Sequence, residues 1–143
     1  MHREKIVRIV LIFVSLFFSI WFFGKSFGYD SDSGNMWVAK NQVGDFGLHI
    51  SLIRSFSLGN NFPPQSPFFP GNFLSYHYLF DLIVGLIVRL GMRIDLSLNG
   101  ASVIAMTTLL YFIFQISQIV FGRNHRIGYL SVIFFLAPGG GVL

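Results

Sequence analysis

The residues best suited to chemistry in the first half of the chain are an aspartate and a histidine. Asp45 and His49 stand four positions apart in the segment GDFGLHISLIRSFSLGNN. On a helix this spacing brings two side chains onto one face. Together they are able to hold a divalent cation, or to act as a base and a positioning group for an anionic headgroup. The structural alternative is that Asp45 caps the helix and His49 is an interfacial histidine.

A second polar group follows a proline-rich stretch and consists of Tyr76, His77, Tyr78 and Asp81. An acidic side chain at membrane depth is costly, which makes Asp81 a candidate functional residue. The structural alternative is that the tyrosines and the histidine lie in the headgroup belt, with Asp81 paired to a neighbouring arginine.

A third polar group, formed by Thr108, Tyr111, Gln115 and Gln118, lies on one stripe of a later apolar segment. Such stripes usually join helices, and the alternative is a path for lipid headgroups. The C-terminal APGGG lacks the lysine of a phosphate loop, and the HExxH and GxSxG motifs of hydrolases are missing from the sequence. Because the chain has no cysteine, it holds no disulfide, zinc thiolate or thiol nucleophile.

The composition places these residues in a membrane protein. Hydrophobic residues make up 53% of the chain and charged residues only 11%, whereas a soluble domain carries about 25% charge. The net charge of +4 comes from scattered residues beside apolar runs. This distribution does not indicate a nucleic-acid partner and points to the lipid bilayer instead.

The first element expected is a transmembrane helix over 6–24, which is 19 residues long and close to the roughly 20 needed for a span. The alternative is a secretory signal peptide, but the apolar run is long for one and no small-residue cleavage site follows. Arg3, Lys5 and Arg8 against Glu4 place the N-terminus in the cytoplasm by the positive-inside rule. The expected location is therefore the cytoplasmic (inner) membrane.

A long extracytoplasmic loop is expected over 25–99. Leu48, Leu52 and Phe56 recur every four residues and predict a short interfacial helix near 46–58, which Gly59 ends. The following NNFPPQSPFFPGN holds four of the five prolines and predicts an extended connector. A second helical stretch near 76–91 has an apolar core bounded by Asp81 and Arg89, too short for a confident span.

The positive-inside rule favours a second stretch that only dips into the membrane surface over one that crosses the membrane. If it dips, the basic turn around Arg123 and Arg126 faces the cytoplasm, and the loop carries no net charge. A transmembrane helix is then expected over 100–121, and the start of a further one over 127–143. The predicted fold class is all-α, with polytopic transmembrane helices and a long first loop that carries juxtamembrane helices.

The layout resembles the start of a GT-C glycosyltransferase, the polytopic class that includes the aminoarabinose transferases and protein O-mannosyltransferases. The similar stretches are VGDFGLHISLIRSFSLGNNFPP, FPGNFLSYHYLFDLIVGLIVRLGMRIDLSLNG and IVFGRNHRIGYLSVIFFLAPGG. The resemblance implies transfer of a sugar from a polyprenyl-phosphate donor to an extracytoplasmic acceptor. It also implies a longer protein, with a second acidic motif after Leu143, and that this portion alone does not catalyse the reaction.

The resemblance also assigns roles. Asp45 matches the acidic residue of the first loop that serves as catalytic base or metal contact, with Mg²⁺ or Mn²⁺ as the possible ion. Tyr76 and His77 match a later position near the donor phosphate. His49 has no firm counterpart in the class, and it stays with Asp81 a candidate substrate-binding residue on chemical grounds.

Two other classes of protein fit the same sequence. One is a non-enzymatic small membrane protein or complex subunit, in which Asp45 caps a helix and the loop packs on a membrane protein partner. The other is part of a transporter, in which the dip lines a substrate path that depends on Asp81.

Overall fold

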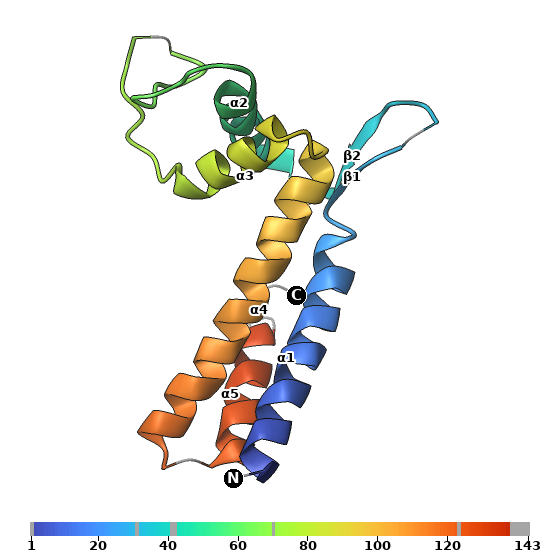
Figure 1. Ribbon diagram of the computed structural model, residues 1–143, viewed down its shortest axis with the longest axis vertical. Helices are drawn as coiled ribbons and strands as arrows, with labels where there is room; N and C mark the ends of the chain where they lie inside the picture. The colour runs from blue at the N-terminus through green and yellow to red at the C-terminus, as the bar shows by residue number, and fades with distance from the viewer. Residues whose placement is uncertain (1, 31, 41–42, 70, 123, 138–143) are drawn as a thin grey trace. The chain divides into compact units, whose positions relative to one another are not determined.

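The computed structural model of the protein describes residues 2–30, 32–40, 43–69, 71–122 and 124–137. The described chain is mostly helical, as the sequence predicts (Figure 1). It also contains a two-stranded hairpin, which the all-α prediction missed. The elements in chain order are α1 (His2–Phe23), β1 (Phe27–Tyr29), β2 (Met36–Val38), α2 (Val43–Leu58), α3 (Leu79–Arg89), α4 (Ile94–Val120) and α5 (His125–Leu136).

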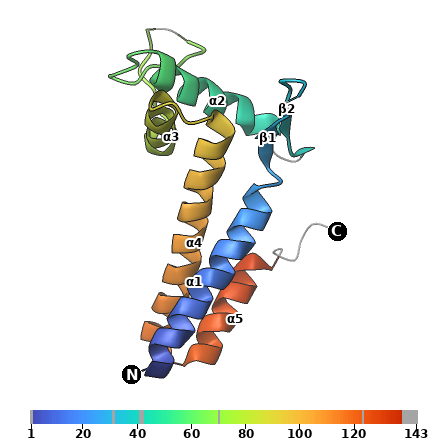
Figure 2. The same cartoon turned by 45° about the vertical axis from the view of Figure 1, so that its right-hand side comes forward.

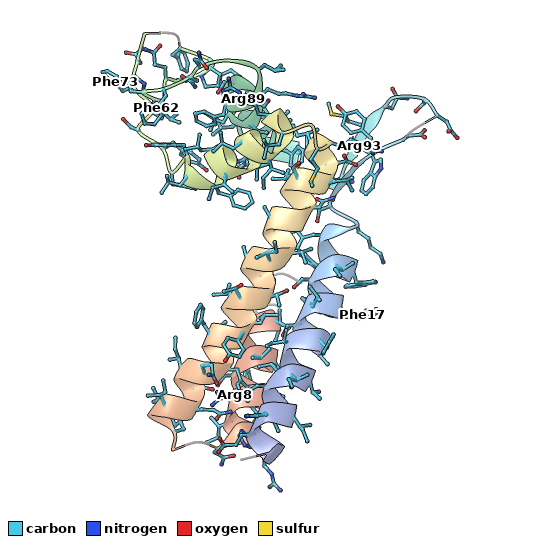
Figure 3. All side chains as sticks on the ribbon, in the orientation of Figure 1. Arg8, Phe17, Phe62, Phe73, Arg89 and Arg93 are labelled. Atoms are coloured by element: carbon cyan, nitrogen blue, oxygen red, sulfur yellow. The ribbon has the colours of Figure 1, made fainter. Side chains whose placement is uncertain are left out.

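Two helices of the described residues, Glu4–Phe23 within α1 and Ile94–Val120 as α4, are long and apolar enough to cross a membrane. Many of their large apolar side chains are uncovered. Phe17, labelled in Figure 3, is 75% exposed, and Ile119 is 80% exposed. A helix in the core of a soluble protein buries such side chains, so their exposure supports membrane association.

Several predicted helix boundaries need correction. The helix α1 begins at His2, four residues before the expected 6, and α3 covers Leu79–Arg89 rather than 76–91. The helix α4 begins at Ile94, six residues before the expected 100, because Ile94 and Leu98 are one turn apart and both pack into a hydrophobic core. The helix α2 begins at Val43, three residues before the expected 46. By contrast, α3 has 11 residues and a length of about 16 Å, which is too short for a hydrocarbon core of about 30 Å.

The chain divides into two compact units, and unit 1 comprises Met1–Ser19 and Val103–Leu143. Its core is formed by Leu11 of α1, Leu110 and Phe114 of α4, and Val132 of α5. Figure 2 shows these three helices next to one another. Gly128 allows α5 to approach closely, because a Cβ there would lie 2.6 Å from the Phe114 ring. Arg123 and the part of the expected last span beyond Ala137 lie outside the described residues.

Of the polar residues predicted to join α4 to other helices, Gln118 does so and Thr108 does not. Gln118 Nε2 lies 2.9 Å from His125 Nδ1 at the start of α5. Thr107, rather than the expected Thr108, donates to Ser19 Oγ of α1 at 3.3 Å. Thr108 itself is exposed. The hydroxyl that faces the neighbouring helix is therefore one position away from the predicted one.

Unit 2 comprises Ile20–Ser102 and contains the hairpin. The strands pair antiparallel, with Phe27 opposite Val38 and Tyr29 opposite Met36. The turn between them is held by Asp30, which accepts hydrogen bonds from the Ser33 hydroxyl at 2.6 Å and the Asp32 N–H at 3.1 Å. A cluster of short polar residues between two apolar triplets is a turn signal, and the sequence prediction overlooked it.

The helices α2 and α3 pack closely and cross each other, since each of Figures 1 and 2 shows one of them along its axis and the other from the side. His49 faces Asp81, and one turn later Ile53 faces Gly85. A Cβ on Gly85 would lie 2.7 Å from Phe56 Cβ and 3.0 Å from the Ile53 carbonyl oxygen. Glycine at this position therefore allows the contact that brings the two helices together.

The predicted proline-rich connector is non-helical between α2 and α3. The Asn61 side chain organises its first turn, because it donates to the Gln65 carbonyl at 3.0 Å and accepts from the Gln65 N–H at 2.9 Å. Pro70, one of the four clustered prolines, lies outside the described residues. The connector returns the chain to α2, since the ring of Tyr78, the residue before α3, lies 6.2 Å from that of Phe56.

Candidate functional site

The helix α2 positions Asp45 and His49 on one cavity of unit 2. Asp45 is exposed and lies in the first turn of the helix, where the helix dipole favours a carboxylate. Because α2 begins at Val43, Asp45 does not occupy the predicted capping position before the helix. His49 follows one turn later and is half-buried. The predicted sharing of one face is confirmed, since both residues line the same cavity.

The partner of His49 is Asp81 of α3. The Nδ1 atom of His49 lies 3.0 Å from Asp81 Oδ1 and 3.1 Å from Oδ2. The alternative that pairs Asp81 with an arginine is therefore wrong. When Asp81 is ionised it only accepts, so Nδ1 donates and Nε2 is left as the basic nitrogen. Nε2 makes no hydrogen bond with any residue in the described ranges.

Asp81 is completely buried, with 0% of its surface exposed. Burial raises the pKa of its carboxyl group, and the hydrogen bond with His49 and the nearby charges of His49 and His77 offset this increase only in part. A buried carboxylate needs a partner, and His49 supplies it. The pair therefore holds the imidazole in one orientation.

Tyr76 and His77 lie beside this pair. The Tyr76 ring centroid is 6.1 Å from that of His49, and Tyr76 stacks on His77 with centroids 3.9 Å apart. His77 is exposed, and its charge acts on Asp81. The structure thus gathers three predicted residues around His49, namely Tyr76, His77 and Asp81.

The cavity that Asp45 and His49 line has a volume of about 360 Å³. Tyr76, His77 and Asp81 are not among its lining residues. Its other polar side chains are Ser26, Asn99 and Ser102, which the sequence prediction missed, and its walls carry four phenylalanines, Phe23, Phe27, Phe46 and Phe80. Asn99 also donates to the Phe27 carbonyl oxygen at 2.7 Å.

One signal in the sequence pointed to the missed residues. Ser97, Asn99 and Ser102 are polar and stand at the start of a long apolar segment. The prediction assigned the residues before 100 to a loop, whereas they form the first turns of α4. Polar residues in the first turns of an apolar helix are typical of a site at the membrane surface.

The donor atoms do not form a metal centre within the part of the chain that the structure describes. No three side chains of histidine, aspartate or glutamate gather there in a way that would hold an ion. Asp45 and His49 are the two potential ligands on the cavity, and the Nδ1 atom of His49 already contacts Asp81. The divalent cation suggested for Asp45 therefore stays a prediction.

Comparison of the chain with protein-family models, curated proteins and solved structures finds no match. The resemblance to the polytopic glycosyltransferases rests on sequence motifs alone. The geometry of the cavity and of the His49–Asp81 pair is therefore the evidence that bears on function.

Proposed function

We propose that this chain is part of an integral-membrane glycosyltransferase that moves a sugar from a polyprenyl-phosphate donor to an extracytoplasmic acceptor. One observation carries the proposal. Asp45 and His49 lie one turn apart on the same cavity, and the buried carboxylate of Asp81 holds His49. Two proton-accepting groups on a partly apolar cavity, in a chain with two potential membrane helices, suit a reaction on a lipid-linked substrate.

The proposed reaction is a single displacement. The acceptor hydroxyl oxygen attacks the anomeric carbon of the sugar, and the bond from that carbon to the phosphate oxygen breaks. The electron pair of the broken bond leaves with the polyprenyl phosphate. The carboxylate of Asp45 takes the proton of the acceptor hydroxyl, since it is exposed to the cavity and lies in the first turn of α2.

His49 positions the reactants in this scheme. With Nδ1 donating to Asp81, its Nε2 atom is available to accept a hydrogen bond from the acceptor. Asp81 acts through His49 and is a positioning residue. Tyr76 and His77 stand beside the pair and are proposed to contact the donor phosphate.

The proposed site faces the outer side of the cytoplasmic membrane. The end of α1 and the start of α4 both belong to unit 2, together with the cavity. If both helices cross the membrane and the N-terminus is cytoplasmic, as its basic residues predict, these two ends emerge outside.

The test is Asp45→Asn in the full-length protein. Sugar transfer from a polyprenyl-phosphate donor in membrane vesicles is expected to fall by roughly 10²–10⁴-fold, the usual contribution of a positioned base. Asp32→Asn is the matched control, because it removes the same charge from an exposed turn of the hairpin. Unchanged transfer by Asp45→Asn at an equal membrane level would remove Asp45 from the reaction.

A second candidate function is a non-enzymatic subunit of a membrane complex. It is favoured by the exposed phenylalanines of the connector, since Phe62 is 76% and Phe73 is 72% exposed (Figure 3). Uncovered aromatic side chains of this kind mark protein or membrane contacts. Under this alternative, replacing both with serine releases a co-purifying membrane protein, whereas Asp45→Asn has no effect.

A further inference from the structure

A second cavity of unit 2 is lined by arginines and takes no part in the proposed transfer reaction. It has a volume of about 640 Å³ and shares no lining residue with the first cavity. The same three helices form both cavities. The helices α2 and α3 contribute residues of their first half to the first cavity and residues nearer their ends to the second. The first turns of α4 contribute to both.

The three arginines of this second cavity come from different elements. Arg54 is on α2, Arg89 is the last residue of α3, and Arg93 directly precedes α4. Gly91 has φ +101° and so reverses the chain between the last two. Figure 3 labels Arg89 and Arg93 on either side of this turn.

The positive charge in the cavity is only partly compensated. Arg93 forms an ion pair with Asp95 at 2.8 Å, and Arg89 donates to Asn60 Oδ1 at 3.5 Å. Arg54 is half-buried and forms no ion pair or hydrogen bond from its side chain to a residue that the structure describes. A half-buried guanidinium group without a partner is a ready binding group for an anion.

The acidic residue on the cavity does not cancel this charge. Asp30 lines it, but both of its carboxylate oxygens already accept hydrogen bonds from the hairpin turn. Three guanidinium groups against the single carboxylate of Asp30 leave the lining with a charge of +2, or +1 when Asp95 is also counted.

We propose that this arginine-lined cavity binds a phosphate group. Guanidinium groups present paired N–H donors that match phosphate oxygens, and arginines from separate elements approach such a group from several sides. The proposal does not depend on the glycosyl transfer reaction, because none of these residues takes part in it.

Two sources of the phosphate share this chemistry: an anionic phospholipid headgroup and a free phosphate compound. The cavity lies at the start of α4, where a helix able to cross the membrane begins. The exposed apolar side chains of Leu58 and Met92 line it as well. An acyl chain would cover them, which favours the lipid.

The experiment uses the full-length protein in uncharged detergent micelles, with binding measured by calorimetry. The probes are inorganic phosphate, short-chain phosphatidylglycerol, and short-chain phosphatidylcholine, whose headgroup has no net charge. Tighter binding of phosphatidylglycerol than of both other probes assigns the site to a lipid headgroup. Binding of inorganic phosphate at least as tight as that of phosphatidylglycerol assigns it to a free phosphate compound.

The variants Arg54→Gln and Arg89→Gln are each expected to weaken binding by about tenfold, as the loss of a charged hydrogen bond requires. Arg126→Gln is the matched control, because Arg126 is an exposed arginine in unit 1. Arg93→Gln is avoided, since it leaves the buried Asp95 without its partner.

Any of four results would overturn the proposal. The first is that neither phosphate nor phosphatidylglycerol binds the unchanged protein, and the second is that phosphatidylcholine binds as tightly as phosphatidylglycerol and more tightly than phosphate. The third is that Arg126→Gln weakens binding as much as the cavity variants, which means that overall charge alone attracts the anion. The fourth is a loss of binding in Arg54→Lys, which keeps the charge, larger than the loss in Arg54→Gln.

Discussion

At the scale of single residues, the site depends on the contact between His49 of α2 and Asp81 of α3. His49 is the residue without a firm counterpart in the resembling class, yet it contacts Asp81 with Nδ1 and lines the cavity with Asp45. The carboxylate of Asp81 is buried while that of Asp45 is exposed. Different surroundings thus fit the roles proposed for the two acidic residues, orientation of His49 for Asp81 and proton transfer for Asp45.

The burial of Asp81 makes stability depend on pH. Because the pKa of Asp81 is raised above its ordinary value of 3.8, the folded state binds this proton more tightly than the unfolded state. Its contribution to stability is complete below the unfolded pKa and is lost as pH rises through the folded pKa. The thermal unfolding midpoint in detergent is therefore expected to fall as pH rises above about 4.

The variant Asp81→Asn is expected to reduce this slope, since asparagine retains an oxygen that accepts from Nδ1 but does not ionise. Asp32→Asn serves as the control and is expected to leave the slope unchanged. A slope in Asp81→Asn as steep as in the unchanged protein would assign the pH dependence to another group.

At the scale of elements, the packing of α2 against α3 creates the site. Gly85 lies one turn after Asp81 and against Ile53, which lies one turn after His49. The same contact therefore sets the separation of the helices and the distance between the histidine and the aspartate. Ile53 and Val84, both 0% exposed, extend the contact into the core of unit 2.

The variant Gly85→Ala tests this packing. Its added methyl group would lie 2.7 Å from Phe56 Cβ. The expected cost is about 2 kcal/mol in the free energy of unfolding, as for other overpacked cores. Urea unfolding in detergent, followed by circular dichroism, measures it.

The control is Gly47→Ala on the outer face of α2, where nothing lies within 4 Å of the new Cβ. This substitution is expected to stabilise the helix by about 0.5–1 kcal/mol, because alanine loses less backbone entropy than glycine. Equal changes in the free energy of unfolding for the two substitutions would mean that close contact at Gly85 does not determine how α2 and α3 pack.

At the scale of the whole molecule, two apolar helices and two units organise the chain. Both candidate cavities belong to unit 2, which also holds the end of α1 and the start of α4. The helix α3 is too short to cross a membrane, so its ends need not lie on opposite sides. If both long helices cross the membrane and the N-terminus is cytoplasmic, as its basic residues predict, the loop over 25–99 is expected outside and Arg126 in the cytoplasm.

This arrangement is tested with single cysteines in a chain that has none. Asn60→Cys and Arg126→Cys are both at exposed positions. A membrane-impermeant maleimide is expected to label Asn60→Cys in intact cells and Arg126→Cys only after permeabilisation. Labelling of Arg126→Cys in intact cells would show that the second helical stretch or another segment crosses the membrane.

The sequence by itself predicted the features that depend on local composition. Apolar runs of membrane length, the proline connector and the short helix around His49 all follow from the order of neighbouring residues. The shared face of Asp45 and His49 is also a local property, because helical spacing alone produces it. The hairpin was predictable in the same way from its turn residues, although the prediction missed it.

Only the tertiary structure decided which residues meet across the chain. His49 and Asp81 are 32 positions apart and come together because Gly85 allows α2 and α3 to pack closely. One cavity is lined by Arg54, Arg89 and Arg93, because α2 and α3 end beside the start of α4. Helical periodicity places a side chain on a face, but packing volume and the burial of apolar surface determine which face it meets.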